Sequence, residues 1–214
     1  MKKYQNLIPA LRKIAETSKN HSVSIQETLL ELKQFGFALI ALILVLPFMQ
    51  PFPIGPISIV GGMTFAALGW QRLKKYPTPI LPTKILNINL SHQNWRRITK
   101  MYIFIIYWAE KITRTRLLWF VTNNTGLKFE GGILIAGGVL MAIPFGALPL
   151  NNFFPGLAIL FSALAQFQKD GLFTLIAIFW LFFSVFYFSI FFFVIYLLSL
   201  KGMQYLPDWV NQSS

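Results

Sequence analysis

The chain has 214 residues, of which 55% are hydrophobic and 16% aromatic, and its mean hydropathy is +0.58. A soluble domain of this size has no interior large enough to bury so much apolar sequence. The net charge of +12 is carried by segments that flank the apolar ones, which is typical of membrane proteins and argues against nucleic acid as a partner. The absence of cysteine excludes disulfides, Cys-based metal sites and thiol catalysis.

Residues 1–34 predict two short amphipathic helices. A capping box, Ser24 to Glu27, opens the second helix, and apolar residues follow at helical spacing. These helices fit either the cytoplasmic membrane surface or a position against the rest of the protein.

Residues 35–71 form an apolar segment broken by prolines, and residues 131–169 repeat its pattern of apolar arm, Pro-Phe pair, irregular stretch, further proline and second apolar arm. Four prolines mark the helix breaks: Pro47, Pro56, Pro144 and Pro155. The first arm, at about 1.5 Å per residue, reaches only roughly half the hydrocarbon thickness. The pattern therefore predicts two re-entrant helical hairpins, with two kinked spans as the alternative.

Residues 72–100 form a basic, proline-containing loop, so the first hairpin is expected to open on the cytoplasmic side. Residues 101–121 are long enough to cross the membrane but contain charges, so they form either an interfacial helix or a span whose charges face protein or water. If this segment crosses, the second hairpin enters from the other side and the two copies form an inverted repeat. The nearly neutral flanks of the second hairpin favour that arrangement.

Residues 172–200 contain no charged residue and are long enough to span a bilayer. This helix would return the chain to the cytoplasm, where residues 201–214 form a tail. We therefore predict an all-α, multi-pass protein of the inner (plasma) membrane, with the two re-entrant hairpins as an inverted internal repeat plus spanning helices. The weak charge bias also predicts a homodimer, with an antiparallel arrangement as one option.

A helix break inside the bilayer leaves backbone groups that only protein or a water-filled cavity can satisfy. The resumed helices near Ile57 and Gly156 would direct their N-termini at an anionic group. Candidate side chains within the breaks are the amides Gln50, Asn151 and Asn152. The alternatives are prolines that only kink two packed helices, and an ordinary turn at the membrane surface.

Charged residues inside or beside the apolar segments are the other candidates for substrate contacts. They are Glu110, Arg114, Arg116, Glu130 and Asp170. Glu110 and Arg114 also fit an ordinary i, i+4 helical pair, and Asp170 followed by glycine fits a turn between two spans.

Enzymatic signals are missing from the sequence. It contains neither a Ser/His/Asp arrangement nor metal-ligand spacing, so we expect no enzyme activity, no cofactor and no metal site. The Gly61-Gly62 and Gly137-Gly138 pairs lack the context of a phosphate-binding loop and predict close helix packing instead.

Two stretches resemble the ExoD (exopolysaccharide synthesis) family. Residues 21–59 are similar to the family's opening, in which a helical leader precedes a Pro-rich break. Residues 144–171 are similar to its second signature, with Pro-Phe-Gly, a polar spacer, another proline and an acid-Gly ending. The chain departs from the pattern at residues 53–56, which replace a Pro-Gly order, and at residues 168–171, where Asp170 is the one acid retained. This departure argues against a role for paired acids.

The resemblance implies a small membrane protein with two re-entrant repeats, loosely like DedA-type transporters. We therefore expect a secondary transporter or exchanger whose partners are the bilayer and a small-molecule solute held between the hairpin tips. The resemblance favours a cationic amino acid such as arginine as that solute. The alternatives are a lipid-phosphate or phospholipid translocase or scramblase, in which Arg114 and Arg116 hold the phosphate, and a non-transporting scaffold in exopolysaccharide export.

Overall fold

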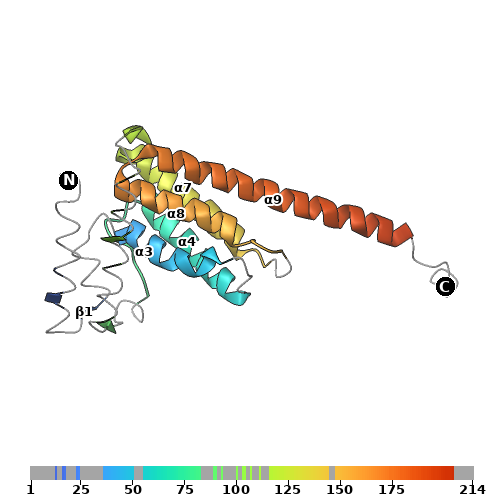
Figure 1. Cartoon of the computed structure of the whole chain (residues 1–214), viewed down its shortest axis with the longest axis horizontal. Coiled ribbons are helices and arrows are strands. Elements are labelled where there is room, and N and C mark those ends of the chain that lie inside the picture. Colours follow the sequence, from blue (N-terminus) through green and yellow to red (C-terminus); the bar gives the residue numbers. More distant parts are fainter. Residues whose placement is uncertain are drawn as a thin grey trace.

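The computed structural model of the chain describes residues 36–50, 55–82, 116–144 and 148–204, together with isolated positions between residues 13 and 111. Its described part is almost entirely helical (Figure 1), which confirms the predicted all-α class. The longer helices are α3 (Gly36–Val45), α4 (Pro56–Leu73), α7 (Asn123–Ala142), α8 (Phe153–Gln168) and α9 (Gly171–Gln204). The shorter described elements are the 3-10 helices η3 (Leu46–Met49) and η4 (Leu118–Phe120) and an antiparallel pair of two-residue strands, β1 (Val23–Ser24) and β2 (Asn89–Leu90).

The helices α3, η3 and α4 form a first helical hairpin. A helix that is apolar on every face is stable only when it is buried, and nearly all of α3 is buried. Pro47 lies in η3, where the α-helix ends because proline lacks an N–H and its ring clashes with the preceding turn. The chain resumes at Gly55, whose φ of 60° favours glycine, and Pro56 takes the first position of α4, where no N–H is needed.

The helices α7 and α8 form a second hairpin. α7 ends at Ala142, two residues before Pro144. α8 begins at Phe153 and carries Pro155 in its first turn, where the missing N–H has no helical partner to lose. All four prolines of the repeated pattern therefore lie at or near a helix end.

Glycines bring α4 and α7 into close contact along their length. A Cβ added to Gly69 would lie 2.6 Å from the carbonyl oxygen of Gly131, and one added to Gly138 would lie 2.5 Å from the carbonyl oxygen of Gly62. Residue numbers rise along α4 as they fall along α7, so the two helices are antiparallel. The close packing predicted for the second glycine of each Gly-Gly pair is therefore confirmed.

The two hairpins point in the same direction. Arg72 at the end of α4 pairs with Glu130 near the start of α7, whereas Ser58 near the start of α4 contacts Asn152 just before α8. We call the first of these ends, which also carries Lys74 and Lys75, the basic end. The opposite end, where residues 46–50, 55–58, 140–144 and 148–156 lie, is the tip end.

The predicted inverted repeat is therefore not confirmed, because α4 and α7 pack side by side through their glycine faces and the described helix ends that flank both breaks lie at the tip end. Arg72 and Asn123 both lie at the basic end, where they line one cavity. Most of the predicted 101–121 helix lies outside the described residues.

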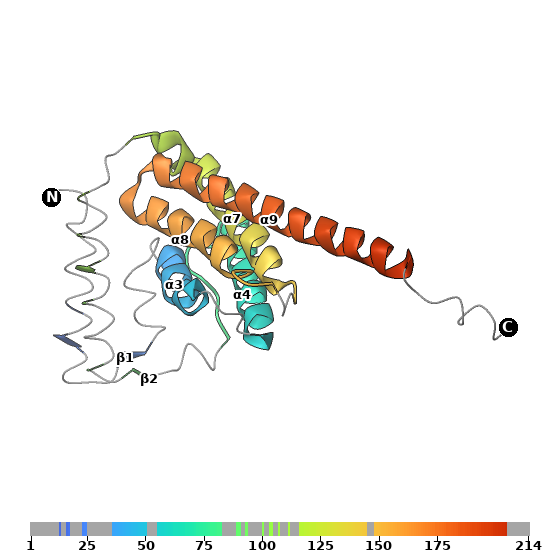
Figure 2. The ribbon, with the colours of Figure 1, turned by 45° about the vertical axis from the view of Figure 1, so that its right-hand side comes forward.

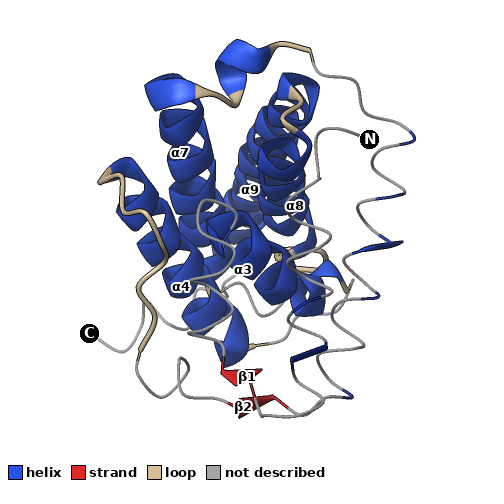
Figure 3. Ribbon diagram, turned by 90° about the vertical axis from the view of Figure 1, so that its left-hand side faces the viewer, coloured by secondary structure: helices blue, strands red, loops and turns tan. Residues whose placement is uncertain are grey.

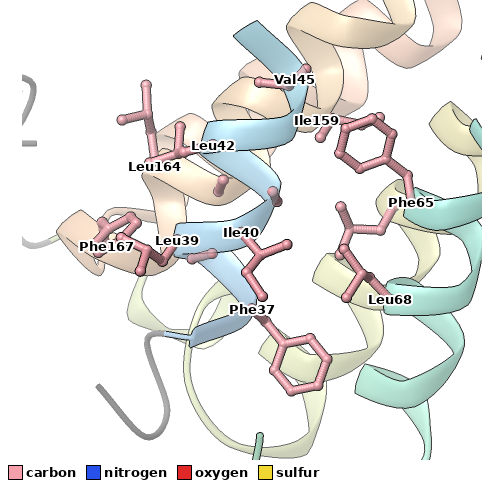
Figure 4. Close-up of a cluster of buried hydrophobic side chains, with 14 of the residues drawn as sticks. Phe37, Leu39, Ile40, Leu42, Val45, Phe65, Leu68, Ile159, Leu164 and Phe167 are labelled. Atoms are coloured by element: carbon pink, nitrogen blue, oxygen red, sulfur yellow. The ribbon is translucent and has the colours of Figure 1, made fainter. Parts of the chain in front are cut away.

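The hydrophobic core is centred on α3, which lies between α4 and α8 (Figures 3 and 4). Figure 4 shows α3 side chains directed toward α4 on one side and toward α8 on the other. The labelled core residues are Phe37, Leu39, Ile40, Leu42 and Val45 of α3, Phe65 and Leu68 of α4, and Ile159, Leu164 and Phe167 of α8.

The last helix, α9, starts at the basic end, runs antiparallel to α8 and continues well past the tip end (Figures 1 and 2). The Tyr187 hydroxyl donates to the carbonyl oxygen of Pro149, 2.8 Å away, so the tip end lies about halfway along α9. The predicted return of the chain to the cytoplasm through this helix stays a prediction, and α9 leads away from the basic end.

Two described helices are long and apolar enough to span a membrane: Asn123–Ala142 and Gly171–Leu200. The apolar window of the second helix is only 11% buried, so it is not the core helix of a soluble protein. Thirty residues at about 1.5 Å each reach about 45 Å, which exceeds a hydrocarbon layer of about 30 Å. The exposed apolar surface of α9 is thus suited to lipid.

Candidate functional site

The tip end contains a buried polar contact between the two hairpins. Asn152 precedes α8, and its Nδ2 donates to the Oγ of Ser58, which lies in the first turn of α4, 2.6 Å away. Asn152 is 1% exposed and Ser58 is 4% exposed. The remaining polar atom of the amide, Oδ1 of Asn152, has no hydrogen-bond partner among the described residues.

Apolar side chains surround this contact. A Cβ built on Gly156, one turn into α8, would lie 3.3 Å from the sulfur of Met49 and 3.6 Å from Val45 at the end of the first arm. Residues 46–60 and 140–158 contain no charged residue. An unpaired acceptor in such surroundings costs free energy of about 1 to 3 kcal/mol, so the site would be stabilised by a group that donates a hydrogen bond to Oδ1.

The start of α8 does not offer the free N–H groups that we expected for an anion. The N–H of Phe153 donates to the carbonyl oxygen of Leu150 at 3.0 Å, and that of Gly156 donates to Asn152 at 2.9 Å. Pro155 has no N–H to give. The turn before the helix, in which Leu150 has a φ of 58°, supplies these acceptors locally. The chemistry of the tip end is therefore dominated by the Asn152 amide.

The acid Glu130 lies at the basic end and is not free to bind a solute. Its Oε2 accepts a hydrogen bond from Nε of Arg72, and both side chains are almost completely buried. The Arg72 guanidinium also lies over the ring of Phe37, 5.1 Å from its centroid. Burial of one charge without the other is costly, so this pair holds α4 against α7.

The acid Asp170 caps α9. It is fully buried, its Oδ1 accepts a hydrogen bond from the N–H of Leu172 at 3.0 Å, and its Oδ2 lies 3.7 Å from Nε of Arg116. The N–H of Gly171 donates to the carbonyl oxygen of Arg116 at 2.9 Å. Asp170 and Arg116 therefore join the end of the second hairpin to α9, as the alternative of a turn between two helices predicted.

The remaining candidates are dispersed. Asn151 is buried beside Asn152, whereas Gln50 is exposed at the end of the first arm. Glu110 and Arg114 lie outside the described residues. No three His, Asp or Glu side chains gather into a possible metal site in the part of the chain that the structure describes.

Sequence reasoning assigned Arg72 only to the basic flank of the first repeat and missed its buried pairing with Glu130. A signal was present, because Gly69 follows Gly62 by seven residues and Arg72 follows Gly69 by three, so the three residues share one helix face. That face is the one turned toward α7.

Comparisons with known proteins give one consistent result. The family model described as "Exopolysaccharide synthesis, ExoD" matches residues 7–190. A curated relative, Protein ExoD of Rhizobium meliloti (strain 1021), is 27% identical over 168 residues, which cover 78% of this chain and 70% of the relative. No solved structure matches the chain. The chain therefore belongs to the ExoD family, which is related to exopolysaccharide synthesis.

Proposed function

We propose that this protein is a transporter of a small polar solute in the inner (plasma) membrane and that it serves exopolysaccharide synthesis. The solute would bind between the hairpin tips at Asn152 and Ser58. The observation that carries the proposal is the Oδ1 atom of Asn152, a buried acceptor without a hydrogen-bond partner among the described residues. Asn152 is 1% exposed, and its Nδ2 already bridges the two repeats through Ser58. Polar groups at helix breaks between repeats are typical of transport sites.

Helix lengths support a location of this contact within the bilayer. α3 has 10 residues and η3 has 4, which together reach about 23 Å, and α8 has 16 residues, or about 24 Å. These two arms are shorter than a hydrocarbon layer of about 30 Å, whereas α4, with 18 residues, and α7, with 20 residues, reach about 27 and 30 Å. If the basic end lies at the cytoplasmic surface, the hairpins are re-entrant and their tips end inside the membrane, while α9 crosses it.

The side chains near the tips favour an uncharged, hydroxyl-bearing solute over a cationic amino acid. A hydroxyl can donate to Oδ1 of Asn152 and accept from a neighbouring donor. Of the acidic candidates for a cationic group, Glu130 and Asp170 are engaged with Arg72 and Arg116 at the basic end, and Glu110 lies outside the described residues. Sugars and polyols carry the required hydroxyl groups, which is consistent with a family related to polysaccharide synthesis.

Counterflow in proteoliposomes tests the proposal. Vesicles that contain the full chain are loaded with a neutral monosaccharide, a polyol or arginine, and uptake of the same labelled solute is compared with empty vesicles. We expect the wild-type chain to take up a neutral solute. Asn152→Leu should lower this uptake by about tenfold or more, because a buried hydrogen-bond partner is removed. Gln50→Leu, which removes an exposed amide from the same end, should change the uptake little.

Three results would contradict this proposal. Uptake of arginine alone would restore the cationic amino acid as the solute. Flipping of a fluorescent phospholipid without solute uptake would favour the lipid translocase. The absence of both activities would favour the scaffold.

A further inference from the structure

A second polar site lies at the basic end, on the far side of the hairpins from Asn152. It is a cavity of about 380 Å³ between the end of α4, the start of α7 and the end of α8. Ligand sites in proteins commonly have volumes of about 300 to 1,000 Å³. The residues that line it are Arg72, Val121, Thr122, Asn123, Leu127, Gln166 and Lys169.

The lining carries two cationic side chains and no acidic one. Arg72 comes from the first hairpin and Lys169 from the second. The Nε of Arg72 is occupied by Glu130, which leaves the other guanidinium nitrogens for a ligand. Asp170, the nearest acid in sequence to Lys169, is paired with Arg116. Within the described part of the chain, Lys169 therefore contributes a positive charge that no acid offsets.

Backbone and amide groups add further donors to the same cavity. The hydroxyl of Thr122 donates to the carbonyl oxygen of Leu118 at 2.6 Å and so does not cap α7. The first N–H groups of this 20-residue helix consequently have no side-chain acceptor among the described residues, and Asn123 beside them lines the cavity. Gln166 adds an amide from α8. The charge of Lys169, together with the further donors of Arg72, Gln166 and the start of α7, matches the oxygen atoms of a phosphate group.

We propose that this cavity binds a phosphate group at the membrane surface. The group could belong to a lipid headgroup or to a free phosphate compound, because both present the same anionic oxygens. The basic end carries the positive charge that marks cytoplasmic segments, and basic pockets between helices at that level suit lipid headgroups. This site is independent of the proposed transport site, since the two lie at opposite ends of the hairpins.

Isothermal titration calorimetry on the full chain in detergent tests this site with three probes: orthophosphate, short-chain phosphatidic acid, and diacylglycerol of the same chain length. We expect binding of at least one phosphate probe and none of diacylglycerol. Lys169→Gln should weaken that binding about five- to tenfold, because a charge-assisted hydrogen bond is lost. The matched control Lys74→Gln removes the same charge from an exposed position at the same end and should change affinity by less than about twofold.

A second variant, Leu127→Trp, fills the cavity from α7 and should abolish binding while the melting temperature stays near that of the wild type. Binding of phosphatidic acid alone assigns the site to a lipid headgroup, and binding of orthophosphate assigns it to a free phosphate compound. The proposal is overturned if neither probe binds, if Lys169→Gln and Lys74→Gln weaken binding equally, or if binding survives in Leu127→Trp.

Discussion

Replacement of Gly138 by alanine should separate α4 from α7. The added Cβ would lie 2.5 Å from the carbonyl oxygen of Gly62 and 2.7 Å from the backbone nitrogen of Ala66. A carbon–oxygen contact of about 3.3 Å is the closest that is ordinarily favourable, so the helices must move apart by roughly 0.8 Å. Overpacking of this kind costs about 1 to 3 kcal/mol, and the better helix propensity of alanine returns only about 0.5 to 1 kcal/mol.

The matched control is Gly132→Ala on the same helix. A Cβ at Gly132 meets no atom within 4 Å, so this variant keeps the gain in helix propensity without the clash. Thermal unfolding of the detergent-purified chain, followed by circular dichroism, should give a lower melting temperature for Gly138→Ala than for the wild type and an equal or higher one for Gly132→Ala. Equal melting temperatures for the two variants would refute the close contact between α4 and α7.

Two further predictions concern the basic end. Arg72→Leu should destabilise the fold by about 3 to 5 kcal/mol, because Glu130 is left buried without its partner, and Arg72→Leu/Glu130→Leu should recover most of that loss in the same melting assay. A double variant as unstable as the single one would contradict the pairing. Single Lys74→Cys and Lys128→Cys variants, in a chain without native cysteine, should react with an impermeant maleimide from the same side of the membrane. Labelling of the two variants from opposite sides would support the inverted repeat instead.

The sequence was sufficient to predict the helical class and the positions at which the helices break. Proline acts locally, through its missing N–H and its ring, so Pro47 and Pro56 could be interpreted without knowledge of the fold. The relative direction of the hairpins could not be predicted in the same way. It depends on which faces of α4 and α7 meet, and the glycines at 62, 69, 131 and 138 indicate such a face only once both helices are known to be neighbours.

The roles of the charged residues were harder to predict from the sequence. An acid in an apolar segment indicates function only if no nearby base neutralises it, and the base that pairs with Glu130 is 58 residues away in the chain. Asp170 looked like a binding residue because of its apolar surroundings, yet its carboxylate caps the helix that follows it. Asn152 was predictable because an amide at a helix break needs partners wherever the fold places it.

Crosslinking of Ser58→Cys/Asn152→Cys tests most directly the central claim that the two hairpin tips meet at one buried polar contact. The native chain has no cysteine, so no background reaction competes. After treatment of membranes with an oxidant or a short bifunctional thiol reagent, the chain is cut at a protease site introduced into residues 72–100. The two fragments should stay joined in this variant and separate in Ser58→Cys/Lys169→Cys, whose positions lie at opposite ends of the hairpins. Fragments that separate equally in both variants would contradict the meeting of the tips.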